Sequence, residues 1–173
     1  MRRIFTIISA LLIATTLTAC GSGQNAATRK ITQVTDGVDL KITQNDSAIK
    51  IVNLLLVATE NGDAVVVGTI VNQGAETDQL LGIAVGGNTA TITGDTTLAQ
   101  NAPLRFEGES ANVKAVFSGV TPVPGRHVKL NLGFARAGMI TAEVIIRDKR
   151  DDYKNVTSGV PEATSSPDSQ QPE

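Results

Sequence analysis

Residues 127–147 read HVKLNLGFARAGMITAEVIIR, and this stretch decides the fold. Apolar and polar side chains alternate through both of its halves, with Ile145 as an exception. A period of two is typical of strands that bury one face and expose the other. Between the halves, Arg136-Ala137-Gly138 predicts a short loop in which the glycine takes the left-handed conformation. The stretch therefore predicts a β-hairpin near the end of an all-β domain.

The middle of the chain has the same strand-and-turn chemistry. Runs rich in Val, Ile, Thr and Leu are separated by Gly, Asn, Asp and Pro, and Asn61-Gly62 predicts a tight hairpin turn. Residues 49–58 follow neither the helical nor the strand period, and we interpret them as a central strand covered on both faces. The predicted strands are 38–43, 49–58, 64–72, 78–85, 89–93, 104–106, 112–118, 127–135 and 139–147.

The number and spacing of these runs predict the domain organisation. Short strands with turn signals at such spacing are typical of an antiparallel β-sandwich of immunoglobulin-like type. We assign residues 37–148 to one such domain. Residues 149–173 begin with charged residues and continue mostly with Ser, Thr, Pro and Gln. They offer too little apolar surface to offset the entropy of ordering, so we expect a disordered tail.

The N-terminal 19 residues have the layout of a bacterial secretory signal peptide. Two arginines precede a short apolar run, which leads to Ala19 and to Cys20, the only cysteine of the chain. The order Leu17-Thr18-Ala19-Cys20 is similar to the lipobox, in which the cysteine is lipidated and becomes the first mature residue. The alternative is a retained transmembrane helix. It is disfavoured because the run is shorter than the roughly 20 residues that a bilayer requires.

A lipidated Cys20 places the protein in the cell envelope. Two or more acyl chains anchor a protein stably, whereas one chain binds only marginally. Residues 20–36, mostly small and polar, are expected to form a flexible tether. We therefore expect the domain on the extracytoplasmic face of the cell membrane. The general secretory route is favoured, and Arg2-Arg3-Ile4-Phe5 leaves the twin-arginine route open.

The composition excludes several classes of function. Loss of the arginines at positions 2 and 3 leaves 13 basic and 17 acidic residues, a formal charge of −4, and no basic stripe for nucleic acid. His127 is the only histidine and Cys20 the only thiol, which excludes thiolate–imidazole catalysis and most zinc sites. We interpret the carboxylates in predicted turns as turn formers. We predict no catalytic, cofactor-binding or metal-binding residue. The expected partners are the membrane, through the covalent lipid, and an unknown envelope protein.

Three blocks of sequence carry a resemblance to a known family. They are VGTIVNQG at 67–74 with DQLLG at 78–82; Gly119-Val120, Pro122 and Pro124-Gly125-Arg126; and VKLNLGF at 128–134 with AGMITAEV at 137–144. In this order they resemble actinobacterial LpqE-type lipoproteins, which are related to the periplasmic copper chaperone (PCuAC) domain. The resemblance covers roughly residues 38–147 and implies a cupredoxin- or immunoglobulin-like sandwich.

The copper ligands implied by this resemblance are missing. Chaperones of the family bind Cu(I) with His and Met, around a late H-x-M motif and an earlier His and Met. Placing the late motif ahead of Gly119 puts its His at Lys114 and its first Met at Val116, and the earlier His falls near Thr93. An ammonium group has donors only and is no ligand for Cu(I).

His127 and Met139 are the remaining candidate donors. They occupy different strands of the predicted hairpin, far from each other, and we interpret them as a strand-edge residue and a residue that follows a turn. The leading hypothesis is a non-catalytic, lipid-anchored accessory or binding module. The alternative is a copper-chaperone-like protein that has lost the His/Met motif or binds copper only weakly. An enzyme ranks third.

Overall fold

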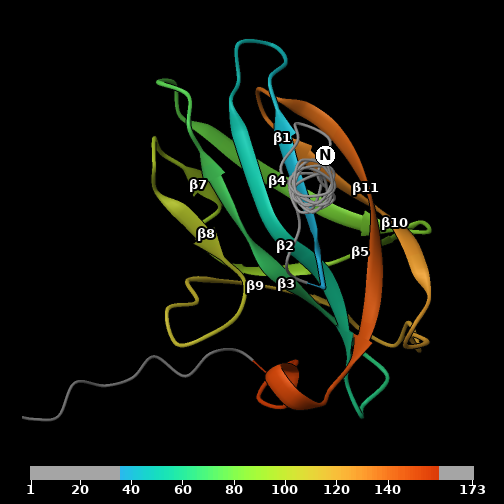
Figure 1. Cartoon of the computed structure of the whole chain (residues 1–173). Helices are drawn as coiled ribbons and strands as arrows, with labels where there is room; N and C mark the ends of the chain where they lie inside the picture. Colours follow the sequence, from blue (N-terminus) through green and yellow to red (C-terminus); the bar gives the residue numbers. More distant parts are fainter. Residues whose placement is uncertain (1–35, 160–173) are drawn as a thin grey trace, which may run out of the picture. The chain divides into compact units, whose positions relative to one another are not determined.

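Residues 36–159 form an all-β fold in the computed structural model of the chain, which describes this range (Figure 1). The signal peptide at 1–19, Cys20, most of the tether and the tail beyond residue 159 lie outside the described residues. Within 36–159, no helix is long and apolar enough to cross a bilayer. The elements in chain order are β1 (Val38–Ile42), β2 (Ile49–Ala58), β3 (Ala64–Asn72), β4 (Asp78–Val85), β5 (Asn88–Thr89), β6 (Thr91–Gly94), β7 (Thr97–Leu98), β8 (Pro103–Arg105), β9 (Val113–Phe117), β10 (His127–Phe134), β11 (Gly138–Asp148) and the 3-10 helix η1 (Asp151–Tyr153).

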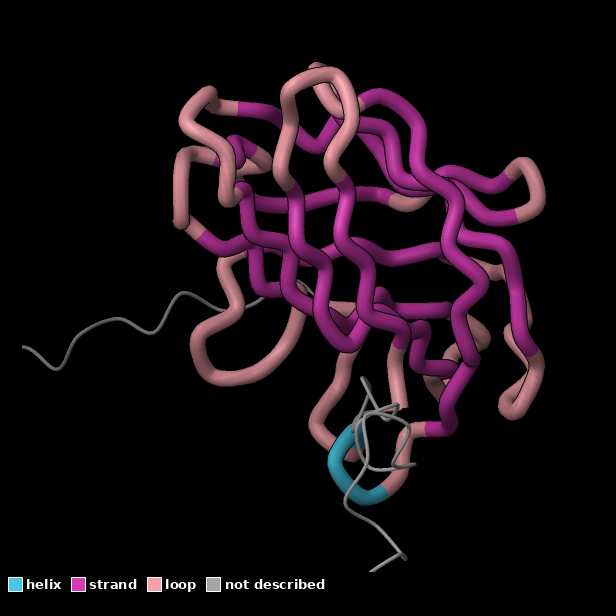
Figure 2. The backbone as a smooth tube through the Cα atoms, turned by 45° about the horizontal axis from the view of Figure 1, so that its top comes forward, coloured by secondary structure: helices cyan, strands magenta, loops and turns pink. Residues whose placement is uncertain are grey.

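The strands form one sheet that wraps around until it is nearly closed. Its order is β5-β4-β10-β11-β2-β3-β9-β6, with β1 paired to β2, β7 to β4 and β8 to β3. The two ends of this order, β5 and β6, are consecutive in the chain and separated only by Ala90. Figure 2 shows the result, with strands of one layer crossing behind those of the other. The all-β class is confirmed, and the sandwich is a barrel-like one.

One pairing departs from the predicted antiparallel pattern. The first part of β11 is antiparallel to β10, whereas its last residues, from Ile146 to Asp148, run parallel to β2. The length of β11 explains this arrangement, because a strand of 11 residues reaches past the end of β10 and joins the two layers. The remaining strand pairs of the described range are antiparallel.

The main core lies between the two layers. Each long strand contributes the apolar residues of one face, as the period of two predicts. The hairpin of β10 and β11 supplies its alternating residues, and β2, β3 and β9 supply the facing ones. The largest of its fully buried members are Phe106, Phe117, Ile49, Ile51, Leu54, Leu56, Ile70, Leu80, Ile83, Leu98 and Leu130.

A β-bulge explains why residues 49–58 fit neither period. The register of β2 against β3 shifts between Val52 and Leu55, and Asn53 in the bulge has a φ of 53°. Before the bulge Ile51 faces the main core, and after it Leu54 does, so the alternation changes phase. The interpretation as a central strand covered on both faces is confirmed, because Leu55 packs in a second buried cluster on the opposite face.

The second cluster corrects the predicted domain boundary at residue 148. It contains Leu55, Val57, Val65, Val67, Val116 and Val156, with Ile145 and Tyr153 packed against them. Val156 is 2% exposed, so residues 149–159 belong to the folded domain and not to a disordered tail. Val156 helps to hold this otherwise polar segment, because it covers valines that would otherwise face water. The same cluster explains the exception at Ile145.

The predicted strand at 89–93 is two strands. The chain leaves β4's layer after Thr89 and joins β9's layer at Thr91, and the Ala90 N–H donates to the Ile83 carbonyl at 2.8 Å. Such a crossing between layers leaves no mark on the hydropathy pattern. The predicted left-handed glycine is confirmed, since Gly138 has a φ of 80°.

Candidate functional site

Lys114 is a buried cation in the described domain, and it occupies the position to which the resemblance assigns the copper-binding histidine. Lys114 lies in β9 and is 6% exposed. The ammonium Nζ donates to the carbonyl oxygens of Thr157 at 2.6 Å and Gly159 at 2.7 Å, and to the Thr157 Oγ1 at 3.3 Å. These three acceptors satisfy the donors of an ammonium group. The charge is therefore held by the segment that follows Val156.

The other positions assigned to copper ligands gather around Lys114. Thr93 in β6 lies directly opposite Lys114 in the register of the two strands, and Thr91 lies opposite Val116. Thr93, Lys114, Val116 and Ser158 line a polar hollow of about 190 Å³. The topology thus brings together the positions that the resemblance assigns to copper ligands. The side chains there are a hydroxyl, an ammonium and a packed valine, none of which is a soft donor.

Glu107 is a second charged group near this place. Burial raises the pKa of its carboxyl, and the positive charge of Lys114 and a backbone hydrogen bond from Gly108 oppose that rise. Its Oε2 is buried without a hydrogen-bond partner among residues 36–159. Desolvation thus outweighs the attraction of the ammonium, which is committed to the C-terminal carbonyls.

His127 and Met139 do not share a site. His127 begins β10 and pairs with Ile145, whereas Met139 pairs with Gly133 at the other end of the same hairpin. The two pairs are six positions apart along the strand, which corresponds to about 20 Å. Both side chains are exposed, Met139 at 68%. This arrangement agrees with their interpretation as surface residues.

Two polar residues of the resembling blocks hold turns. Asp78 is 4% exposed; its Oδ1 accepts from the backbone N–H of Gln79 and Arg136, and its Oδ2 from that of Ala137. Asn72 is 1% exposed and donates from Nδ2 to the carbonyls of Glu76 and Leu98. Asp78 therefore fixes the loop before β11, and Asn72 fixes the approach to β4 and the place of β7. The polar residues of these blocks therefore have a structural role in holding turns.

Within residues 36–159 no group of three or more His, Cys, Asp or Glu side chains is arranged to hold a metal ion. Cys20, the predicted lipidation site, lies outside this range. Sequence reasoning missed the contact of Lys114 with Thr157 and Gly159, because it placed those residues in the tail. The signal that was available is Val156, the apolar residue that precedes them.

Comparisons with known proteins place the fold. No protein-family model matches the chain, and no curated protein matches its sequence. Among solved structures, the fold is similar to the apo PCuAC domain from PmoF1, with a TM-score of 0.53 and 20% identity over 64% of this chain and 99% of that one. It is also similar to the copper-bound PCuAC domain from PmoF2, with a TM-score of 0.53 and 16% identity over 64% of this chain and 98% of that one. The described domain therefore has a PCuAC-like fold.

Proposed function

We propose that this chain is a lipid-anchored, non-catalytic relative of the PCuAC copper chaperones that has lost the copper site. In this proposal Cys20 carries the lipid, and the domain stands on the extracytoplasmic face of the membrane as an LpqE-type lipoprotein. The domain then acts as a binding or accessory module for an envelope protein. The observation that carries the proposal is the buried ammonium of Lys114, held by the Thr157 and Gly159 carbonyls.

The chemistry of these groups disfavours Cu(I). That ion is bound by thiolate, thioether and imidazole groups, whereas carbonyl and hydroxyl oxygens suit harder cations. A second positive ion beside the Lys114 ammonium would also be repelled in a place where only 6% of the lysine is exposed. Val116 packs in the second apolar cluster and has no donor atom. Copper binding would therefore require substitution of both residues.

A Cu(I) titration against a competing chelator tests this proposal. The protein is the chain from position 20 to 173 with Cys20→Ser, because a free thiol at Cys20 would itself bind Cu(I). We expect no binding tighter than micromolar. The matched control carries Thr93→His, Lys114→His and Val116→Met in the same chain, and we expect it to gain Cu(I) binding. Tight binding by the chain without these substitutions would contradict the loss of the site.

The anchor is tested separately with Cys20→Ser in the precursor. Membrane fractionation and labelling with an alkyne fatty acid should show label on the unsubstituted chain and none on the variant. The variant should be released from the membrane or remain unprocessed. Membrane retention together with normal cleavage of Cys20→Ser would contradict the assignment of the anchor.

A further inference from the structure

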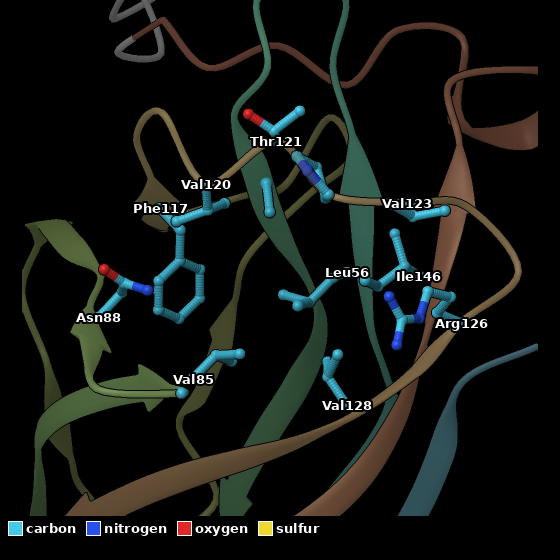
Figure 3. Close-up of a pocket in the computed structure, with 13 residues that line it drawn as sticks. Leu56, Val85, Asn88, Phe117, Val120, Thr121, Val123, Arg126, Val128 and Ile146 are labelled. Carbon is cyan, nitrogen blue, oxygen red and sulfur yellow. The ribbon is translucent and has the colours of Figure 1, made fainter.

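An apolar pocket of about 290 Å³ opens at one end of the wrapped sheet (Figure 3). Its walls come from both layers, with Leu56 of β2, Phe117 of β9, Val128 of β10 and Ile146 of β11 around it. The loop between β9 and β10 forms the remaining side. This volume lies just below the range typical of small-molecule sites, about 300 to 1,000 Å³.

The pocket connects the core with solvent. Phe117 and Leu56 in its depth are 1% and 2% exposed, whereas Val123 at its mouth is 51% exposed. Valines also flank the opening on the β4 side and in the loop, at Val85 and Val120. The lining from core to mouth is mostly apolar, with Asn88 and Thr121 as its uncharged polar members, and it suits an apolar chain that enters from water.

The mouth is held in place by backbone hydrogen bonds. The Thr121 N–H donates to the Gly62 carbonyl at 2.9 Å, and the Gly125 N–H donates to the Ile146 carbonyl at 2.7 Å. The Ile146 N–H in turn donates to the Arg126 carbonyl at 2.8 Å. The loop is therefore fastened at one end to the turn between β2 and β3 and at the other end to β11, which lines the pocket. A preformed mouth reduces the entropy that a ligand must offset on binding.

Arg126 gives the pocket a charge preference. It is the one charged residue that lines the pocket, as far as residues 36–159 are concerned. Figure 3 shows its guanidinium turned between Ile146 and Val128 toward the middle of the pocket. No ion pair or side-chain hydrogen bond to another residue of the described range engages it. A planar guanidinium matches the two oxygens of a carboxylate.

We propose that this pocket binds a fatty acid or a similar single-chain carboxylate. The chain enters between the layers over Leu56 and Phe117, and the carboxylate pairs with Arg126 at the mouth. The pocket volume favours a chain of about ten carbons, because the methylenes of a longer chain would remain outside the filled pocket. Each methylene that enters should tighten binding by about fourfold until the pocket is full.

The test compares decanoate with decanol, which has the same chain and no charge. Binding is measured by amide chemical shifts of the chain 20–173 carrying Cys20→Ser. Decanoate should shift amides around Val128 and Phe117 and bind about tenfold more tightly than decanol, because a guanidinium–carboxylate pair is a charge-assisted bond. Arg126→Gln should abolish this difference, so that both ligands bind like decanol. Octanoate should bind more weakly than decanoate by the factor for two methylenes.

Met139→Ser is the matched control, because it removes an exposed apolar side chain at the other end of the hairpin. Binding of decanoate should not change in this variant. Retained amide dispersion in Arg126→Gln shows that the variant is folded, as expected for an exposed side chain. Equal affinity for decanoate and decanol in the unsubstituted chain would overturn the proposal. So would shifts centred on Met139, or no shift with either ligand.

Discussion

Replacement of Lys114 by Met tests how the C-terminal segment is held. The substitution keeps an unbranched chain of similar length and removes the ammonium group. In the folded protein the carbonyls of Thr157 and Gly159 then lose their donor. We expect the free energy of unfolding to fall, and we expect the whole effect to depend on the presence of residues 157–159.

The magnitude follows from the geometry. Two of the hydrogen bonds from Nζ are short, at 2.6 and 2.7 Å, and the bond to Thr157 Oγ1 at 3.3 Å is weak. A hydrogen bond from a charged group contributes about 1.5 to 3 kcal/mol. We use the lower value because Thr157 and Gly159 are exposed, which gives about 3 kcal/mol for the pair. Desolvation of the ammonium reduces the net contribution of Lys114 to stability. This desolvation cost is present in any chain that keeps Lys114 buried.

A double-mutant cycle removes that common cost. Urea unfolding is measured for Lys114 and Lys114→Met in the chain 20–173 and in a chain that ends at Val156. We expect a coupling energy of about 3 kcal/mol, with little or no loss from the substitution in the shorter chain. Hydrogen exchange of the Val156 amide, which donates to the Tyr153 carbonyl, should accelerate in the longer variant.

Lys129→Met is the control, since Lys129 is exposed on β10. It should have the same small effect in both chain lengths. If Lys114→Met destabilises the two chains equally, the contacts with Thr157 and Gly159 contribute nothing, and the reasoning is wrong.

Three further substitutions test the fold. Asp78→Ala should lower the free energy of unfolding by about 3 kcal/mol in urea, because three backbone N–H groups lose their acceptor, and an unchanged midpoint would contradict its role. Gly68→Ala should lower the free energy of unfolding by about 2 kcal/mol, since Gly68 has a φ of 145° and a Cβ there would lie 3.1 Å from the Leu54 Cα. Gly82→Ala is the control and should be nearly neutral, because a Cβ at Gly82 meets no atom within 4 Å. Glu107→Gln should change the pH dependence of stability. Because the folded state raises the pKa of Glu107, stability falls as pH rises above the ordinary value of about 4.3. The variant should lose this decline. Identical pH profiles of the variant and the unsubstituted chain would contradict this expectation.

The period of two was sufficient to predict most of the sheet. The bounds of β2, β3 and β4 agree with the predicted ranges because each is a long apolar run that ends at a turn former. The hairpin of β10 and β11 follows from alternation alone. The crossing at Ala90 was missed because one small residue carries the chain between layers without interrupting the β-type composition. In the sequence, the bulge at Asn53 is visible only as the lack of a regular hydrophobic period in residues 49–58.

The candidate site was predictable in part. The resemblance located Thr93, Lys114 and Val116, which lie near each other on β6 and β9. It did not indicate what Lys114 does, because its partners are backbone carbonyls. Any residue has a carbonyl, so no sequence pattern marks Thr157 and Gly159 as acceptors. Arg126 was part of a resembling block, but its place at the mouth of a pocket depends on strands far apart in the chain.

A final prediction follows from how the resemblance is distributed over the structure. Asn72 and Asp78 hold backbone turns of the sheet, whereas the side chains of Thr93 and Lys114 make no strand-ladder bond, and Lys114 holds only the segment after Val156. In this chain the ammonium of Lys114 binds the carbonyls of Thr157 and Gly159. The triple variant Thr93→His, Lys114→His and Val116→Met should therefore bind Cu(I) with similar dissociation constants whether the chain ends at Val156 or at residue 173, because loss of the Lys114 ammonium already releases the segment that carries Ser158. Chelator competition measures both chain lengths. Markedly tighter binding by the shorter chain would show that the segment covers the hollow even without Lys114.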